Sequence, residues 1–248
     1  MSFVNSLIRD KKPCYFISPH LDDAALSAGG LLSYLRGKVP IQVITIFTKP
    51  LSPNTLYAKR YIQKCGFQDA YKLFIERVKE DKVVFSSRGV YPQCLDYVDA
   101  AWRKKDCFAP SILNSIFPEL IHVYPTRFHV LGGKIHKDDE ILVQSLTRRL
   151  KRLVKSPQES VVFCPLGVGG HVDHLIVHNV CSALFKNVIY WSDFPYNLKK
   201  KPQNSHAIKF EWYKNIKNKK DLILGYKTQH RALFKEAFIP IIPEIFYE

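Results

Sequence analysis

The sequence contains no apolar run near the roughly 20 residues that a membrane-spanning helix needs. Its first ten residues also lack a basic segment followed by a sustained apolar core, so we do not expect them to form a secretory signal. We therefore expect no transmembrane segment and a cytoplasmic location. The six cysteines include no CxxC pair, and Cys14 and Cys164 lie in apolar, strand-like segments. This pattern favours buried thiols over a disulfide framework.

Acidic residues are few: the sequence has 22 Asp and Glu but 37 Lys and Arg, which gives a formal net charge of +15. Such an excess invites a nucleic-acid partner, since Lys and Arg neutralise phosphates. The excess is instead spread over short runs without any nucleic-acid-binding motif, so we expect no nucleic acid to bind. A solvated basic surface and an acidic substrate or membrane surface remain as two interpretations. The runs are Lys11-Lys12, Arg103-Lys104-Lys105, Arg148-Arg149-Leu150-Lys151-Arg152, Lys199-Lys200-Lys201 and Lys214 to Lys220.

The length of 248 residues and a composition of 46% hydrophobic and 24% charged residues are typical of a globular chain with one full core. There is no internal repeat and no low-complexity tract, so we expect a single domain over residues 1–248. Residues 78–137, interrupted by four prolines, are predicted to form a loop-rich insertion with short helices over the site. Residues 199–248 are predicted to form a C-terminal extension that packs on the body.

Short apolar segments rich in β-branched and aromatic residues alternate along the chain with segments of helical spacing. This alternation predicts a parallel sheet with right-handed crossovers, whose strands are buried on both faces. Ligands in such sheets bind beyond the carboxyl ends of the strands. The predicted strands are 14–17, 41–47, 161–164 and 188–191, and the predicted helices are 24–35, 55–65, 139–154 and 174–185.

The segment Ser18-Pro19-His20-Leu21-Asp22-Asp23 stands where the first predicted strand ends and a small-residue helix begins. His20 and Asp23 are three residues apart and can reach one cation, which leaves Asp22 to handle a proton. The alternative is a simple helix start, in which the aspartates cap free N–H groups. The chain contains its own control, because His136-Lys137-Asp138-Asp139-Glu140 has the same spacing without a preceding strand. We expect that copy to cap a helix.

A second cluster, Gly169-Gly170-His171-Val172-Asp173-His174, follows the predicted strand 161–164 and so falls at the same edge of the sheet. A His-Asp-His ligand set with an open position is typical of catalytic zinc, although it also suits non-haem iron(II). Asp173 has two open interpretations, as a hydrogen-bond partner that orients a histidine and as a helix cap. His178 is expected to be a packed histidine rather than a ligand.

Together, the two clusters resemble the zinc-dependent de-N-acetylases of the PIG-L or LmbE-like family. Further landmarks follow in that family's order, so the resemblance covers roughly residues 13–230. The sequence departs from the common pattern at Leu21 and Ala24, which replace Pro and Glu, and at Thr228, where Ser is frequent. These departures leave the substrate open. The landmarks are Arg77 to Asp81, Leu95 to Arg103, Asp193 to Tyr196 and Tyr226 to Gln229.

The resemblance implies a Rossmann-like, three-layer α/β fold with a mostly parallel sheet. It also implies a hydrolase that removes an N-acetyl or other N-acyl group from an amino sugar such as an N-acetylglucosamine conjugate. By the same resemblance, His20, Asp23 and His174 hold zinc, Asp22 is the general base, His171 stabilises the oxyanion, Asp173 orients a histidine, and Arg77 and Asp99 touch the sugar.

The chemistry of these residue types leads to the same reaction. Amide hydrolysis needs a nucleophile at neutral pH, stabilisation of the oxyanion and a proton for the leaving amine. Metal-bound water, protonated His171 and Asp22 are able to supply them in turn. The alternative is a non-catalytic sugar- or anion-binding protein on the same fold, which has no need for a spare carboxylate at Asp22. The basic charge makes an acidic glycoconjugate a reasonable partner.

Overall fold

A seven-stranded, mostly parallel sheet forms the centre of the protein in a computed structural model that describes residues 2–105, 116–202, 207–234 and 239–248. The first five strands along the chain pair in parallel, and the last strand pairs antiparallel with both of its neighbours. The order across the sheet is β3-β2-β1-β4-β5-β7-β6. The strands are β1 (Cys14–Ser18), β2 (Ile41–Lys49), β3 (Gln93–Val98), β4 (Val161–Pro165), β5 (Val188–Trp191), β6 (Ile208–Trp212) and β7 (Glu244–Tyr247).

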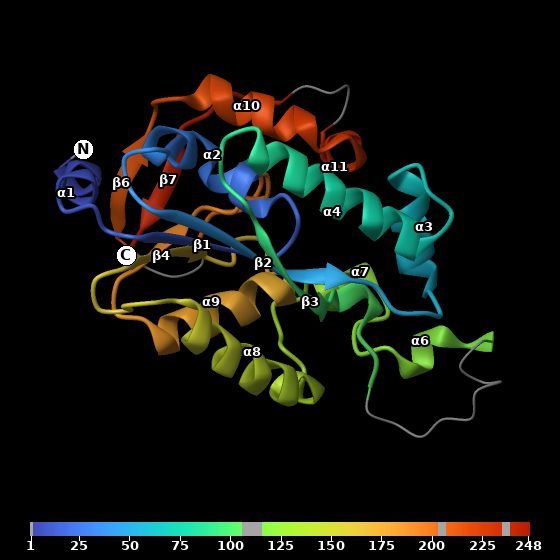
Figure 1. The fold of residues 1–248 in the computed structure, drawn as a ribbon. Helices are drawn as coiled ribbons and strands as arrows, with labels where there is room; N and C mark the ends of the chain where they lie inside the picture. Colours follow the sequence, from blue (N-terminus) through green and yellow to red (C-terminus); the bar gives the residue numbers. More distant parts are fainter. Residues whose placement is uncertain (1, 106–115, 203–206, 235–238) are drawn as a thin grey trace.

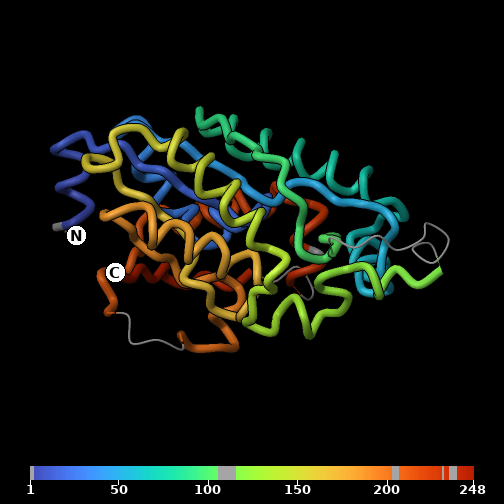
Figure 2. Tube along the Cα trace, turned by 90° about the horizontal axis from the view of Figure 1, so that it is seen from below, coloured from blue at the N-terminus to red at the C-terminus, as the bar shows by residue number. Residues whose placement is uncertain are grey.

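Helices cover both faces of this sheet and complete the predicted three-layer α/β fold (Figure 1). The helices α2, α4, α10 and α11 lie on one face, and α8 and α9 lie side by side on the other (Figure 2). The α-helices are α1 (Ser2–Arg9), α2 (Asp23–Leu35), α3 (Leu56–Lys64), α4 (Ala70–Ser86), α6 (Pro118–Ile121), α7 (Arg127–Val130), α8 (Glu140–Leu153), α9 (Val172–Leu184), α10 (Ile216–Gly225) and α11 (Lys227–Leu233). The 3-10 helices are η1 (Ala100–Trp102), η2 (Lys137–Asp139) and η3 (Tyr196–Leu198).

The central strands are buried on both faces, as their continuous apolar character predicts. Side chains alternate along a strand, so Phe16 of β1 joins the core beneath α2 while Ile17 joins the core beneath α9. Phe163 of β4 stacks on Phe16 with ring centroids 4.7 Å apart. Each side chain of this size contributes about 1.5–3 kcal/mol when it leaves water. The element bounds confirm the four predicted strands and the four predicted helices, with ends shifted by up to two residues.

The C-terminal extension does more than pack on the body, because β6 and β7 join the sheet itself. Glu244 of β7 accepts hydrogen bonds from the backbone N–H groups of Gly30 and Leu31 in α2, at 2.8 and 2.9 Å. This approach depends on a small residue at Gly30, where an added Cβ would lie 3.1 Å from the carbonyl oxygen of Lys214. The extension thus fixes α2, the helix that begins at Asp23 and follows the turn with His20 and Asp22.

The prediction of loops and short helices over 78–137 is wrong for its first part. Helix α4 continues to Ser86, and β3 forms an edge of the sheet. The helical pattern of α4 is hard to recognise because Arg77, Glu80 and Asp81 are charged but buried among its apolar residues. Strand β3 has a mixed character because only one of its residues is fully buried. The segments beyond it, 99–105 and 116–137, hold the short helices that were expected.

Three predicted features concern residues outside the described ranges: Pro110 as one of the four prolines that interrupt 78–137, His206 as an isolated surface or core histidine, and Phe238 as the start of an apolar segment near the C-terminus. Within those ranges, no helix combines the length and apolarity needed to cross a membrane. The cysteines of the same ranges are free thiols, and Cys14 and Cys164 are buried as expected.

Helices α4 and α11 are joined by two buried carboxylates that follow Arg77 in the chain. Glu80 accepts hydrogen bonds from the backbone N–H of Thr228 at 3.0 Å and from its hydroxyl at 2.6 Å. The Tyr226 hydroxyl donates to Asp81 over 2.7 Å. Burial raises the pKa of Asp81 to about 7, although the hydrogen bond from Tyr226 opposes this shift. The landmarks at Arg77 to Asp81 and Tyr226 to Gln229 therefore meet in space.

This burial makes Asp81 a pH-dependent element of stability. The folded protein holds a proton on Asp81 up to about pH 7, whereas the unfolded chain releases it near pH 4, so the free energy of unfolding falls as pH rises between these values. We expect Asp81→Asn to remove this dependence, which amounts to a few kcal/mol at about 1.4 kcal/mol per pKa unit. Urea unfolding of both proteins at pH 5 and pH 8 measures it, with exposed Asp221→Asn as the control. An unchanged pH slope in Asp81→Asn would contradict this role.

Candidate active site

The site lies where the carboxyl ends of the parallel strands meet. His20, Asp22 and Asp23 follow β1, and His171, Asp173 and His174 follow β4, the neighbouring strand in the sheet. The chain leaves β1 toward β2 on one side and β4 toward β5 on the other, which makes this position the topological switch point where open α/β sheets bind ligands. The predicted convergence of the two clusters is confirmed.

The turn after β1 is held by Ser18 and Asp23, and Asp22 takes no part in capping. The Ser18 hydroxyl donates to the carbonyl oxygen of His20 at 2.7 Å and accepts from the Ala24 N–H at 3.0 Å. Asp23 Oδ2 accepts from the His20 N–H at 2.8 Å. Asp22 occupies the N-cap position of α2 without a side-chain capping hydrogen bond. The helix-cap interpretation of Asp22 is therefore wrong, and its carboxylate stays available.

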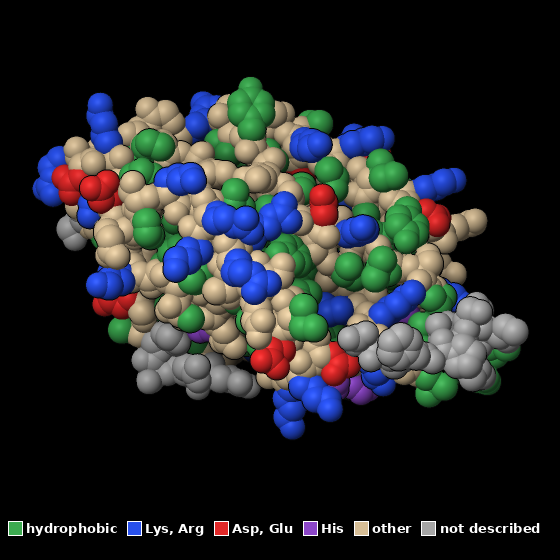
Figure 3. Space-filling model, turned by 60° about the horizontal axis from the view of Figure 1, so that its bottom comes forward, with side chains coloured by type: hydrophobic (Ala, Val, Ile, Leu, Met, Phe, Trp, Pro, Cys, Tyr) green, Lys and Arg blue, Asp and Glu red, His purple; other side chains and the backbone are tan. Residues whose placement is uncertain are grey.

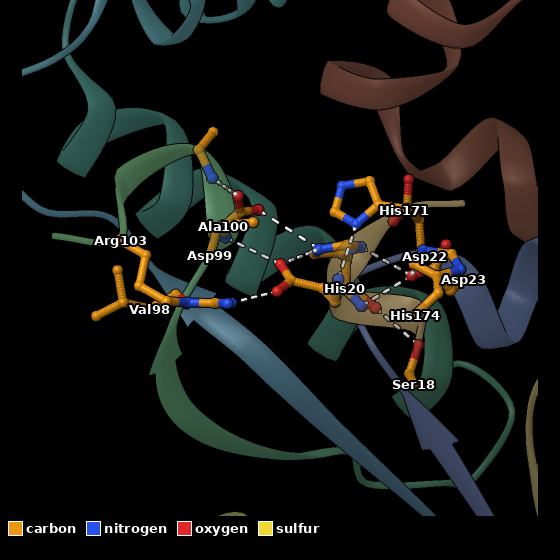
Figure 4. A network of polar contacts seen from close by, with 12 residues as sticks. Ser18, His20, Asp22, Asp23, Val98, Asp99, Ala100, Arg103, His171 and His174 are labelled. Carbon is orange, nitrogen blue, oxygen red and sulfur yellow. Dashed lines mark hydrogen bonds and ion pairs between the residues drawn. The ribbon is translucent and has the colours of Figure 1, made fainter. Parts of the chain in front are cut away.

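His20, Asp23 and His174 bring one ligand atom each to a common buried point. Asp23 Oδ2 lies 3.0 Å from His20 Nδ1 and 3.3 Å from His174 Nε2. His174 Nε2 is buried and, among the described residues, has no hydrogen-bond partner. Figure 4 shows His20 between Asp99 on one side and Asp23 with His174 on the other. A divalent cation can replace a proton on a buried imidazole nitrogen beside a carboxylate, so this set is a candidate metal site.

Asp193, at the end of β5, orients His174. Its Oδ1 lies 2.7 Å from His174 Nδ1, and its Oδ2 accepts from the N–H groups of Gly167 and Val168, both at 2.8 Å. A carboxylate at Nδ1 assigns the ring proton to that nitrogen and leaves Nε2 as a ligand. In the sequence, Asp193 is only a landmark of the family resemblance, without a predicted role. The signal that could have identified it is its position just after a buried strand.

A second group, His20, His171 and Asp173, also has its ligand atoms close together. Asp173 is already engaged, because its Oδ2 lies 3.0 Å from His20 Nε2 and accepts from the Ala100 N–H at 2.9 Å. Its Oδ1 accepts from the Arg103 guanidinium. The set with the unpartnered His174 Nε2 is therefore the better metal site. Asp173 does contact a histidine, but the partner is His20 rather than a neighbour in sequence.

Arg103, which the sequence placed in a basic surface run, is buried under the site. It donates to Asp139 at 2.8 Å as well as to Asp173, and the Tyr124 hydroxyl donates to Asp139 at 2.6 Å. Asp139 belongs to the segment His136 to Glu140, which has the same spacing as His20 to Asp23. As predicted, this segment caps a helix start, because His136 Nδ1 accepts a hydrogen bond from the Asp138 N–H at 3.2 Å. The capping role is thus only part of that segment's contribution. Arg103 and Asp139 are 36 residues apart, so local pattern gives no sign of their pairing.

The two neighbouring aspartates differ in acidity. Burial raises the pKa of Asp22 to about 6, while the Arg77 guanidinium, with Nη2 3.4 Å from Asp22 Oδ1, limits the rise. Burial also opposes ionisation of Asp23, but His174 and His20 outweigh it and hold the pKa of Asp23 well below its usual value. One carboxylate is thus a permanent anion, whereas the other is poised near neutrality to exchange a proton.

His171 is held as a neutral imidazole. Burial lowers its pKa well below the usual value, and positive charge on His20 and His174 lowers it further. Its Nδ1 accepts from the Asp173 N–H at 3.2 Å, so its proton is assigned to Nε2. The sequence-based expectation of a protonated His171 is therefore not supported. A neutral ring with Nε2–H still offers one hydrogen-bond donor.

Arg77 and Asp99, predicted to touch the sugar, both adjoin this centre. Arg77 is buried beside Asp22, and within the described ranges its Nε has no hydrogen-bond partner. Asp99 follows β3, accepts from the Ala101 N–H at 2.9 Å, and places Oδ2 3.6 Å from His20 Nε2. The structure thus brings all eight predicted site residues to one edge of the sheet.

The fold and the site define an α/β protein with a buried His-Asp cation centre and an adjoining proton-exchanging carboxylate. The model of the PIG-L family, described as GlcNAc-PI de-N-acetylase, matches residues 15–185, more than half of the chain. The chain belongs to this family of deacetylases, so it is an amidohydrolase-type enzyme.

Known proteins similar to this chain agree with that assignment. A 2'-N-acetylparomamine deacetylase of Niallia circulans is 25% identical over 92% of this chain and 84% of its own length. A crystal structure of the zinc-inhibited form of teicoplanin deacetylase Orf2 superposes with a TM-score of 0.76 at 18% identity, covering 95% of this chain and 97% of that one. The A40926 pseudoaglycone deacetylase Dbv21 gives 0.64 at 16% identity, covering 96% of each chain. The structural matches show the same fold.

The buried pairs of Arg103 make a testable contribution to stability. Arg103→Met would remove the guanidinium partner of the buried carboxylates Asp139 and Asp173, and removing one partner of a buried ion pair costs about 3–5 kcal/mol. We expect a loss of that order in the free energy of unfolding, measured by urea denaturation. Lys105→Met, an exposed site in the same basic run, is the matched control. Equal small losses in both variants would contradict the assigned role of Arg103.

Proposed function

We propose that the protein is a zinc-dependent hydrolase that removes an N-acetyl group from an amino-sugar conjugate. The observation that carries this proposal is the convergence of His20, Asp23 and His174 on one buried point. Beside this point lies Asp22, whose carboxylate makes no helix-capping hydrogen bond. The family assignment supports the deacetylase reaction. The family description, GlcNAc-PI de-N-acetylase, and the names of the similar proteins, which are deacetylases of 2'-N-acetylparomamine, teicoplanin and the A40926 pseudoaglycone, support an acetylated amino sugar as the substrate class.

The donor set fits a zinc ion. His174 Nε2 is a buried, unpartnered nitrogen, Asp23 is a permanent anion, and two imidazoles with one carboxylate are a common catalytic zinc set. In this proposal His20, Asp23 and His174 hold the metal. When bound, zinc acidifies water and polarises the amide carbonyl. Asp193 fixes His174, and Asp173 fixes His20, so both rings are oriented before the metal arrives.

The remaining residues move the proton and receive the developing charge. Asp22 takes the proton of the attacking water and delivers it to the amide nitrogen, so that the C–N bond breaks to give acetate and a free amine. Its pKa of about 6 suits this exchange near neutral pH. His171 donates its Nε2–H to the oxyanion that forms on the carbonyl oxygen. Arg77 keeps part of the Asp22 population ionised.

Arg77 and Asp99 are proposed to bind the sugar hydroxyls. They approach the centre from α4 and from the end of β3, and Arg77 Nε is a buried donor without a partner in the part of the chain that the structure describes. Buried polar groups of this kind are normally satisfied, so a substrate hydroxyl is a suitable acceptor. Asp99 supplies a carboxylate oxygen for a second hydroxyl.

Asp22→Asn tests the general base. We expect turnover of an N-acetylglucosamine conjugate, scored as released amine, to fall by about 10²–10⁴-fold, because general-base catalysis contributes that much. Zinc content should stay near that of the wild-type protein. Asp138→Asn is the matched control, because Asp138 has the same position after His136 that Asp22 has after His20. Near-wild-type turnover in Asp22→Asn would show that another group acts as base.

Metal dependence is tested separately. The protein should bind about one zinc per chain, lose activity on chelation and recover it when zinc is restored. His174→Ala should retain far less zinc than the wild-type protein in elemental analysis, and Asp193→Asn should weaken zinc binding by about 10–100-fold because it releases the ring that it orients. Full activity in the thoroughly chelated protein would exclude the proposed metal centre.

A further inference from the structure

A cavity with a volume of about 300 Å³ adjoins the candidate active site. Three segments that are distant in sequence form it: residues 131–134, the loop 166–170 with Leu175, and residues 200–202. Gly170 directly precedes His171, and its carbonyl oxygen accepts from the Gly133 N–H at 2.9 Å. The hollow therefore begins one residue away from a group of the proposed reaction.

The side chains that line this cavity carry charge of one sign. Lys134, Lys200 and Lys201 contribute to its wall, and none of the lining residues is acidic. Lys200 Nζ donates to the carbonyl oxygen of Gly169 at 3.1 Å, which holds it against the loop. Lys134 and Lys201 have no ion-pair partner among the residues that the structure describes. Three cationic groups without a carboxylate favour an anionic occupant.

The wall between the lysines consists largely of glycine backbone. Gly133, Gly167, Gly169 and Gly170 all have positive φ, a conformation that glycine adopts without strain. At Gly169 an added Cβ would lie 2.7 Å from the ring of Tyr196, which contacts His174 edge-on with ring centroids 5.7 Å apart. A wall of glycine lets a ligand approach the backbone closely. Tyr196 then stands between the cavity loop and the candidate metal centre.

The general basic surface does not explain this arrangement. Figure 3 shows Lys and Arg side chains spread over the face that carries α8, interspersed with side chains of other kinds. The exposed basic residues of α8, such as Lys151 and Arg152, lie on a helix face. At the cavity, by contrast, lysines from two distant segments meet at a hollow beside the site. Convergence at a hollow is what a specific ligand needs.

We propose that this cavity binds the oxyanion of an acidic aglycone, a phosphate or a carboxylate, while the acetamido group of the same substrate occupies the candidate metal centre. The proposal rests on the deacetylase function and names the substrate class within it. Lys134 and Lys201 bind the oxyanion directly, and Lys200 binds it while anchored on Gly169. Part of the excess positive charge of the chain thus has a specific role, which is to bind an anionic group of the substrate next to the site.

The experiment compares three proteins: the wild type, the triple variant Lys134→Gln, Lys200→Gln and Lys201→Gln, and a control triple variant. The control is Lys64→Gln, Lys151→Gln and Lys217→Gln, which removes the same charge from exposed positions elsewhere. Inorganic phosphate is titrated calorimetrically into each metal-free protein, so that binding at the metal is not measured. Deacetylation is measured on zinc-loaded proteins with N-acetylglucosamine 1-phosphate, a carboxymethyl glycoside and the neutral methyl glycoside of N-acetylglucosamine.

We expect the wild type and the control to bind phosphate and to prefer acidic conjugates over the neutral one by about tenfold or more in kcat/KM. The cavity variant should lose both properties and keep its activity on the methyl glycoside. A preference confined to the phosphate or to the carboxylate would identify which oxyanion the cavity takes.

Equal rates on acidic and neutral conjugates in the wild type would overturn the proposal, and so would an acidic preference that survives in the cavity variant. Phosphate binding that depends on the three lysines without any substrate preference would show an effector site instead. Phosphate binding without deacetylation of any conjugate would refute the proposed function while leaving the anion site in place.

Discussion

The site depends on the burial of Arg103 between Asp139 and Asp173. A guanidinium inside the protein is tolerated only with anionic partners at close range, and two carboxylates meet this need, Asp139 from the segment before α8 and Asp173 from the segment after β4. Asp173 in turn contacts His20 Nε2 and so fixes the ring whose Nδ1 faces Asp23. The position of a candidate metal ligand therefore depends on an ion pair that lies beneath it.

Buried charge also explains why neighbouring groups of the same type behave differently. Asp22 and Asp23 are adjacent and both buried, yet the first has a raised pKa because burial prevails, and the second a lowered pKa because two imidazoles adjoin it. His171 and His174 differ in the opposite sense: burial and the neighbouring imidazoles both lower the pKa of His171, whereas Asp23 and Asp193 outweigh burial and raise the pKa of His174. In such a site, the balance between burial and the charged partners within a few ångströms decides the protonation state.

Much of the fold could be predicted from the sequence because the patterns that indicate its strands and helices are local. The doubly buried strands are continuous apolar runs, and the helices after β1 and β4 begin beside the clusters that predicted the site. Helix α4 and strand β3 were missed because buried charges interrupt the apolar pattern of the first and an edge position dilutes that of the second. Arg103 and Asp193 were not assigned roles for a related reason, since each acts through a partner far along the chain or in another loop.

By itself the sequence determined the chemistry that is available: a histidine and two carboxylates after one strand, and two histidines after another. Because strand and helix periodicity are local properties, it also determined that these groups share an edge of a parallel sheet. Only the tertiary structure decided which nitrogen of each histidine faces Asp23, which aspartate makes no helix-capping hydrogen bond, and which lysines line the cavity. These outcomes depend on contacts between segments up to 153 residues apart, such as that of His20 with Asp173, and local patterns do not encode such distances.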